Sequence, residues 1–249
     1  MSQKTENIDD SKQPLIQHLV ELRSRLIKSL ILISVLFVAA YIFADTIYNF
    51  LVQPYADAVS GDENRRLIFT ALHETFFTYL KVALFASIFI ALPFILIQIW
   101  IFIAPGLYKN EKSVVVPYLI ATPILFFIGA ALVYYFIMPL AIKFFLSFES
   151  IGGDGSLPIQ LEAKVNEYLS LVMRLIFAFG LSFQLPVILT LLARMGFASS
   201  EGLRKNRKYV IVGVFAVAAI LTPPDPISQI GLGIPILILY ELSIFAVKF

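Results

Sequence analysis

Cysteine is absent from this 249-residue chain, and charge is scarce. Without cysteine there are no disulfides, no cysteine-ligated metals and no thiol catalysis. Charged residues make up only 14% of the sequence, and the formal net charge of +2 is too small to indicate a nucleic acid as the partner. The few basic residues lie in short clusters beside apolar segments, which is typical of membrane topology signals rather than of polyanion binding.

Catalytic signatures are also missing. The sequence contains no GxxxxGK[ST] loop, no HExxH pair and no GxSxG elbow, which excludes the usual sites for ATP hydrolysis, zinc proteolysis and serine hydrolysis. The two histidines, His18 and His73, fall on opposite sides of the membrane in the topology derived below. The sequence therefore predicts a protein that is not an enzyme and that uses no cofactor.

Long apolar runs dominate what is present. Hydrophobic residues form 59% of the chain, the mean hydropathy is +0.86, and the runs are long enough to cross a hydrocarbon core of roughly 30 Å. They are continuous rather than alternating, so helices and not a barrel are expected. The prediction is an all-α, polytopic integral membrane protein, one transmembrane domain over residues 1–249. Its six kinked helices, forming a concave bundle, are expected at about 26–43, 76–103, 114–136, 168–192, 209–221 and 227–247.

Topology follows from the basic residues, because cytoplasmic loops retain positive charge. The first apolar run begins near Leu26, too late for a typical cleaved signal peptide, so it is expected to remain as the first helix. Six crossings then place both termini on the cytoplasmic side. The basic residues that support this are Lys4, Lys12, Arg23, Arg25, Lys109, Lys112, Arg194, Arg204, Lys205, Arg207 and Lys208.

The fifth segment is unusually short. Its 13 residues make only about 20 Å of helix, so the bilayer is expected to thin there. The alternative is that the helix continues for a few residues across the Thr222–Asp225 break. Prolines within the segments predict kinks, and no internal repeat supports a transporter built from two halves.

Two charged positions near the cytoplasmic face have ordinary explanations. Leucines at helical spacing over residues 14–25 predict an interfacial helix leading into the first crossing, in which Glu21 and Arg25 are spaced for a local ion pair. The loop after the second crossing turns at Pro105-Gly106 and leaves Glu111 between two lysines, as a solvated loop charge.

Several long motifs, in order along nearly the whole chain, give these positions another meaning. They are HLVELRSRL, FIAPGLYKNEK, YFIMPLAIKFF, YLSLVMRLIFAFGLSFQLPV and LRKNRKYVIVGVFAVAAILTPPDPISQ. With these motifs the sequence resembles the TatC family, the core membrane subunit of the twin-arginine protein translocase. The resemblance implies a signal-peptide receptor and scaffold in the bacterial inner membrane. It also implies single-helix TatA-type and TatB-type partners in a multimeric complex, and export of folded proteins driven by the proton motive force.

The resemblance also implies a signal-peptide site. Glu21 and Glu111 match the family's recognition positions, and a carboxylate is the best ligand for a guanidinium because it accepts two parallel hydrogen bonds. The same motifs add Arg23, Arg25, Phe102 and Lys109.

Polar positions inside the membrane are expected to meet partner helices. Gln184 stands where the family often has glutamate, and we expect it either to line the concave membrane face or to be an amide inside the bundle. Thr222, Asp225 and Gln229, in the TPPDPISQ motif, are expected to make polar contacts with the partners, although Asp225 is also suited to cap the last helix.

Three further charges lie within apolar segments. Arg174 shares a helix face with Glu167 and Ser170, which predicts an Arg174–Glu167 pair, and Lys81 is expected to extend toward the exported interface. Glu241 is an acid in the last segment with no evident partner. A proton-coupled small-solute transporter, the main alternative function, would make Arg174, Glu241 and Lys81 central.

Overall fold

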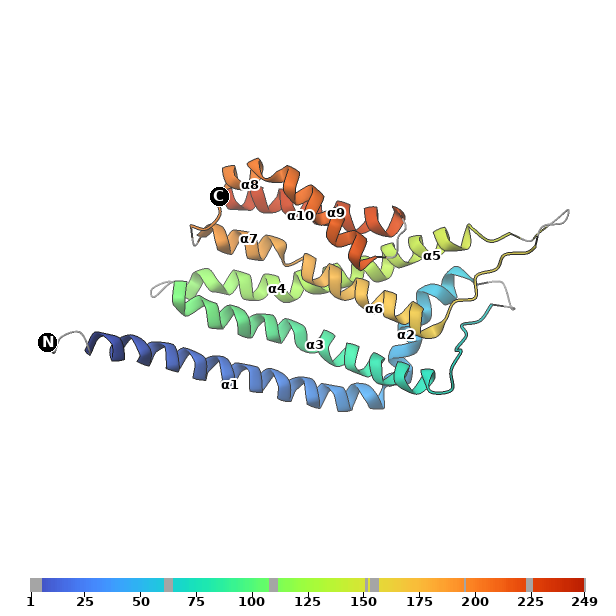
Figure 1. Ribbon diagram of the computed structural model, residues 1–249, viewed down its shortest axis with the longest axis horizontal. Helices are drawn as coiled ribbons and strands as arrows, with labels where there is room; N and C mark the ends of the chain where they lie inside the picture. The colour runs from blue at the N-terminus through green and yellow to red at the C-terminus, as the bar shows by residue number, and fades with distance from the viewer. Residues whose placement is uncertain are drawn as a thin grey trace.

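The computed structural model describes residues 6–60, 65–107, 112–150, 152, 157–194, 196–222 and 226–248. This part of the chain is nearly all helical, and its long helices run along a common axis (Figure 1). The elements are α1 Glu6–Ile42, α2 Ala44–Ala58, α3 Glu74–Leu107, α4 Lys112–Leu132, the π-helical turn η1 Val133–Ile137, α5 Met138–Leu146, α6 Val165–Ser182, α7 Leu185–Arg194, α8 Ser200–Lys205, α9 Arg207–Leu221 and α10 Pro226–Lys248.

The crossing helices agree with the sequence. Five stretches are long and apolar enough to span a bilayer: 17–42, 74–102, 116–146, 165–194 and 228–248. The predicted short fifth segment corresponds to α9, whose 15 residues make about 22 Å of helix and which is not among these five stretches. In contrast, α10 has 23 residues, about 35 Å, which is enough for a full crossing.

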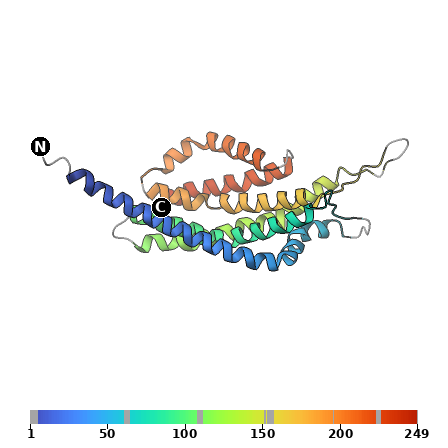
Figure 2. The same cartoon turned by 60° about the horizontal axis from the view of Figure 1, so that its bottom comes forward.

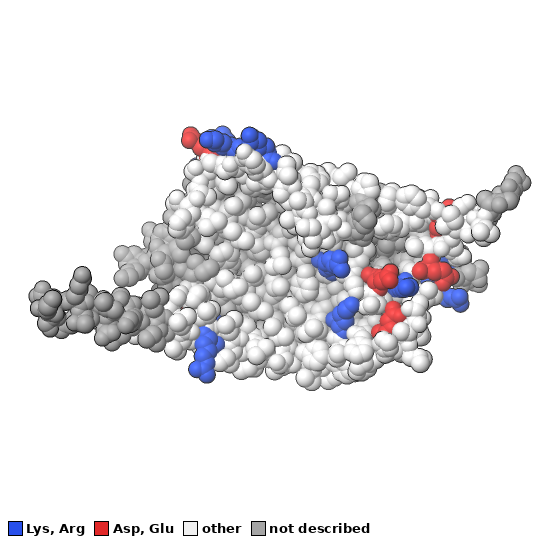
Figure 3. Space-filling model, in the orientation of Figure 1, with Lys and Arg blue, Asp and Glu red and all other residues white. Residues whose placement is uncertain are grey.

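The described chain begins and ends at the same end of the bundle (Figures 1 and 2). We call this the basic end, because Figure 3 shows basic side chains gathered there over α8 and the start of α9. The opposite end, the loop end, carries residues 65–73, 147–150 and 157–164. Toward the loop end, Figure 3 shows basic side chains mixed with acidic ones, and the assignment of the basic end to the cytoplasm stays a prediction.

Helix α1 packs mainly on α3 and is otherwise open to lipid. Only 11% of its most apolar stretch is buried. Small residues, Ala40 on α1 with Ala83 and Ala86 on α3, form the close contact between the two helices. Where the sequence suggested an interfacial helix followed by a crossing, the structure has one uninterrupted helix of 37 residues.

Glycines allow α4 and α6 to approach closely at the centre of the bundle. A Cβ added at Gly129 would lie 2.7 Å from the Phe179 carbonyl oxygen, and one at Gly180 would lie 2.5 Å from the Phe126 ring. Both phenylalanines are completely buried. Association of membrane helices relies on such backbone proximity, since lipid supplies no hydrophobic drive between helices.

Helix α2, which the sequence did not predict, is tied to the bundle through its carbonyls. Pro54 has no N–H to donate to the carbonyl of Phe50, four residues earlier. The Tyr134 hydroxyl donates to that oxygen instead, at 2.8 Å, and Tyr168 donates to the next carbonyl, of Leu51, at 3.2 Å. The proline therefore leaves the Phe50 carbonyl oxygen free to accept the bond through which α2 docks.

Two features interrupt the long helices. The turn η1 adds a π-helical stretch between α4 and α5, and residues 183–184 separate α6 from α7 just before Pro186. At the loop end, Arg65 holds Glu149 through two bonds of 2.5 Å, and the same carboxylate accepts from Leu161 N–H at 2.7 Å. This charged pair fastens Glu149 and Leu161 to the segment before α3.

Candidate functional site

An ion pair on α1 faces α3 near the basic end. Arg25 donates through Nε and NH2 to Glu21 Oε1, at 3.0 and 2.5 Å, and through NH1 to Gln98 Oε1 of α3 at 2.7 Å. The Arg25 side chain is 18% exposed and that of Glu21 is 41% exposed. The pair predicted from the i,i+4 spacing is therefore present, and a neighbouring helix holds its arginine in place.

An aromatic contact between α1 and α3 lies next to this ion pair, nearer the basic end. His18 stacks on Phe102 with ring centroids 4.0 Å apart and an interplanar angle of 13°. His18, Glu21 and Arg25 occupy one stripe of α1, at i, i+3 and i+7, while Gln98 and Phe102 are one turn apart on α3. Together these five residues form what we call the α1–α3 seam.

The seam offers a hydrogen-bond acceptor to an incoming cation. Both bonds from Arg25 end on Oε1 of Glu21, and within the described chain Oε2 receives none. An ionised carboxylate has about four acceptor positions, so Glu21 can take a second guanidinium while keeping its own arginine. The stacked His18–Phe102 pair provides an aromatic surface beside it.

The structure brings together Glu21, Arg25 and Phe102 of the predicted signal-peptide residues. Arg23 lies on the same helix and is exposed. Lys109 and Glu111 lie outside the described residues. Sequence analysis missed Gln98, although a lone amide in the apolar run FILIQIWIFI, one turn before Phe102, was a usable signal.

Gln184 is an amide inside the bundle, so the expectation that it lines a concave membrane face is wrong. Its side chain is 2% exposed, and Nε2 donates to the Thr122 carbonyl at 2.9 Å. Trp100 Nε1 donates to the Thr122 hydroxyl at 3.0 Å, which joins α3, α4 and the α6–α7 break. The Gln184 amide thus ties the α6–α7 break to α4.

The predicted partner-contact residues hold α9 and its connection to α10. Thr222 is 5% exposed and donates to its own helix at the Ala218 carbonyl, at 2.8 Å. Gln229 Nε2 donates to the Phe215 carbonyl of α9 at 3.3 Å. Asp225 lies outside the described residues. Contact of these residues with a partner helix stays a prediction.

The remaining intramembrane charges differ from expectation. Glu167 pairs with Lys164 at 3.7 Å, and Arg174 has no ion-pair partner among the described residues, so the predicted Arg174–Glu167 pair is wrong. Arg174 is seven residues from Glu167, about two helical turns, whereas an ion pair along a helix spans about one turn. Glu241 pairs with Arg207 at 2.6 Å near the basic end. Glu241 thus lies at the opposite end of the bundle from Arg174 and Lys81, so the three charges do not converge on one site, which speaks against the transporter alternative.

Comparison with known proteins gives a consistent result. The family model described as "Sec-independent protein translocase protein (TatC)" matches residues 17–235. The protein of that name from Magnetococcus marinus is 49% identical over 240 residues, covering 96% of this chain and 86% of the relative. The Escherichia coli K12 protein is 41% identical, covering 98% and 91%. A crystal structure of the twin-arginine translocase receptor TatC has 37% identity and a TM-score of 0.79, covering 93% of this chain and 98% of that one.

Proposed function

The chain belongs to the TatC family of Sec-independent protein translocase subunits, and from that premise we propose that its α1–α3 seam receives the twin-arginine signal peptide. As a member of this family it is a membrane-embedded subunit of a protein translocase and not an enzyme. The solved relative is described as a receptor, and a receptor needs a surface that distinguishes its ligand.

One observation carries the proposal: Glu21 presents a half-exposed carboxylate with an open oxygen, held in place by Arg25 and Gln98. A guanidinium binds such a group by parallel hydrogen bonds, whereas an ammonium binds as a point charge without that geometry. The seam is therefore suited to prefer arginine over lysine. Glu111 is proposed as the second acid, which would give each arginine of the pair its own carboxylate.

The setting of this site completes the proposal. The basic end faces the cytoplasm of a bacterial inner membrane, where the signal peptide of a folded cargo protein arrives. TatA-type and TatB-type single-helix subunits associate with the bundle in a multimeric complex, and the proton motive force drives transport. The Arg23 side chain, exposed beside the seam, keeps like charge near the site and disfavours basic peptides that lack the paired contact.

Peptide binding to the purified full chain tests the proposal. A twin-arginine peptide is titrated against its twin-lysine counterpart, with the unmodified protein and with Glu21→Gln. The matched control is Glu201→Gln, which removes an exposed acid from α8 at the same end. We expect the unmodified protein and the control to prefer arginine, and Glu21→Gln to lose roughly three- to tenfold in affinity, as for a half-exposed charged pair.

Equal affinity for both peptides would refute recognition of the guanidinium. Unchanged arginine binding in Glu21→Gln would remove the seam as the site and leave family membership intact.

A further inference from the structure

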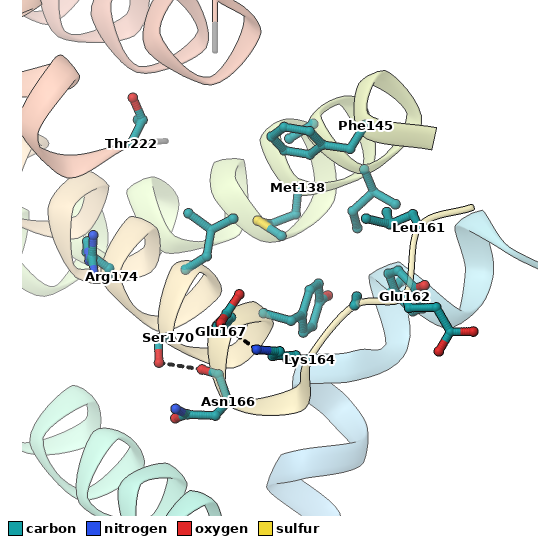
Figure 4. A pocket seen from close by; sticks show the side chains of 16 residues that line it. Met138, Phe145, Leu161, Glu162, Lys164, Asn166, Glu167, Ser170, Arg174 and Thr222 are labelled. Atoms are coloured by element: carbon teal, nitrogen blue, oxygen red, sulfur yellow. Dashed lines mark hydrogen bonds and ion pairs between the residues drawn. The ribbon is translucent and has the colours of Figure 1, made fainter. Parts of the chain in front are cut away.

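A second polar region lies far from the α1–α3 seam, on the membrane-facing surface near the loop end. Two cavities, of about 660 and 450 Å³, share Lys164, Asn166 and Glu167 among their lining residues. They form one hollow along the first turns of α6. The larger cavity is bounded by apolar side chains of α5, including Met138 and Phe145, and by Thr222 at the end of α9 (Figure 4).

Two cations line this hollow on the side away from the loop end, Arg174 in the larger cavity and Lys81 in the smaller one. Arg174 is exposed on α6, and no described residue pairs with it. Lys81 of α3 donates to Asn166 Oδ1 at 2.8 Å and to Ser170 Oγ at 2.9 Å. Ser170 is one helical turn before Arg174, so the Lys81 ammonium binds to the turn of α6 that precedes the Arg174 guanidinium. Figure 4 shows Asn166, Ser170 and Arg174 following one another along α6.

Acids lie nearer the loop end, in the same order on both helices. Glu74 precedes Lys81 by seven residues on α3, and Glu167 precedes Arg174 by seven residues on α6. Both helices start at the loop end, so each carboxylate is about 10 Å further out than the cation of its helix. Long basic side chains that extend outward along the helix reduce this separation. Lys164 partly neutralises Glu167, whose side chain remains 73% exposed.

This order matches the head of one class of lipid. In a phosphoethanolamine headgroup the phosphate is nearer the acyl chains and the ammonium is nearer the water. A phosphate at Arg174 and Lys81 places the ammonium toward Glu167 and Glu74, and the acyl chains then run away from the loop end, past the exposed Leu84 of α3 and Leu181 of α6. An unpaired arginine on a lipid-facing surface is costly, and a phosphate relieves that cost through charge-assisted hydrogen bonds.

We propose that this hollow is a binding site for an amine-bearing phospholipid of the exported leaflet, with Arg174 and Lys81 holding the phosphate and Glu167 the amine. The exposed apolar side chains beyond the two cations distinguish a lipid from free phosphate, since inorganic phosphate gains nothing from Leu84 or Leu181. The acids distinguish phosphatidylethanolamine from phosphatidylglycerol, which has no amine to donate to them.

Native mass spectrometry of the full chain in detergent tests the site. The protein is titrated with phosphatidylethanolamine or phosphatidylglycerol of identical acyl chains, with inorganic phosphate as the soluble competitor. We expect phosphatidylethanolamine to bind more tightly and Arg174→Gln to lower its affinity about tenfold, as for loss of a charged hydrogen bond. Arg174→Lys keeps the charge and should retain most of the binding. The matched control is Lys143→Gln, an exposed cation of α5 outside this hollow, which should change nothing.

A second variant tests the orientation of the headgroup. Glu167→Gln should abolish the preference for phosphatidylethanolamine without weakening the binding of phosphatidylglycerol. The proposal fails if Arg174→Gln binds lipid as Lys143→Gln does, if the two lipids bind equally to the unmodified protein, or if inorganic phosphate displaces the lipid at equal concentration. It also fails if Arg174→Gln leaves lipid binding intact but releases a co-purified protein subunit, which would assign the face to a partner helix.

Discussion

A carboxylate at a membrane surface binds a ligand with a strength set by how much water it keeps. Glu21 is 41% exposed and already shares one oxygen with Arg25, so its contribution to peptide binding falls between that of a solvated pair and that of a desolvated one. A charged pair contributes under about 1 kcal/mol to binding when it is exposed and about 2 to 5 kcal/mol when it is desolvated. A second acid is therefore needed for tight recognition of two arginines.

Substitutions at Glu111 test for that second acid. Glu111→Lys should abolish measurable binding of the twin-arginine peptide and protein export, because repulsion is added to the lost contact. Glu111→Gln should retain part of the binding, since the amide oxygen still accepts a hydrogen bond. The measurement is peptide affinity of the purified variants, with thermal unfolding as the check on folding. Binding of Glu111→Lys equal to that of the unmodified protein would show that position 111 is only a loop charge.

For single residues, the sequence predicts contacts between neighbours along a helix and misses contacts between residues far apart in the chain. The Glu21–Arg25 pair follows from helical spacing alone. Its third member, Gln98, is 73 residues from Arg25, and nothing in the spacing indicates which α3 residue faces α1. The same limit explains Arg174, whose helix face was predicted correctly but whose partner was not.

Helices of this protein pack through glycine as well as through large side chains. At Gly180 the α6 backbone lies against the ring of Phe126, which is completely buried. A membrane bundle cannot readily relieve a clash there, because the neighbouring side chain is confined on all sides.

Gly180→Ala should therefore destabilise the protein by about 1 to 3 kcal/mol, as overpacking of a tight core does. The matched control is Gly213→Ala in α9, where nothing lies within 4 Å of the added Cβ. Removing a helix-interior glycine at such an open position should stabilise the protein by roughly 0.5 to 1 kcal/mol. Thermal unfolding in detergent compares the two variants. A Gly180→Ala protein as stable as Gly213→Ala would show that α4 and α6 do not meet as described.

Two helices were predictable to within a few residues from their long apolar runs, whereas the helix expected at 26–43 begins at Glu6. The predicted 76–103 and 227–247 segments correspond to Glu74–Leu107 and Pro226–Lys248. Helix α2 was missed because its mixture of polar and apolar residues lacks a transmembrane signal. The π-helical turn η1 was also missed, since its residues VYYFI resemble any other apolar turn.

At the scale of the whole molecule, a 22 Å helix beside helices of full length imposes a mismatch on the surrounding lipid. We expect the bilayer to thin at α9, which would shorten the distance that cargo must cross. The length of α9 should therefore match the hydrocarbon thickness best in a thin membrane.

Reconstitution into nanodiscs tests this expectation. The unfolding temperature should be higher in dimyristoyl than in dierucoyl phosphatidylcholine, because the thinner bilayer matches α9 without deformation. An equal unfolding temperature in both lipids would indicate that α9 tilts freely or lies away from lipid. A stability maximum in the thicker bilayer would contradict the thinning argument.

Partner docking can be mapped because the chain contains no cysteine of its own. Single cysteines at Val212 of α9 and Ile238 of α10 are expected to crosslink to single-helix subunits carrying a cysteine. Val35 of α1 and Ile120 of α4 are comparably exposed controls. Apolar replacement of Gln229 should weaken the crosslinks modestly, since an interhelical hydrogen bond in lipid is worth about 1 kcal/mol. Crosslinks found only at Val35 and Ile120 would place the partners on the opposite edge of the bundle.

The π-helical turn between α4 and α5 sets which side of α5 faces the core. Such a turn holds about one residue more than the α-helical turn it interrupts. Each residue advances an α-helix by about 100°, so removing one from Val133–Ile137 would rotate α5 by that angle. Met138, Ala141 and Ile142 would then turn from the core toward lipid. Chains that share this bundle should therefore keep the same residue count between α4 and α5, even where the letters change.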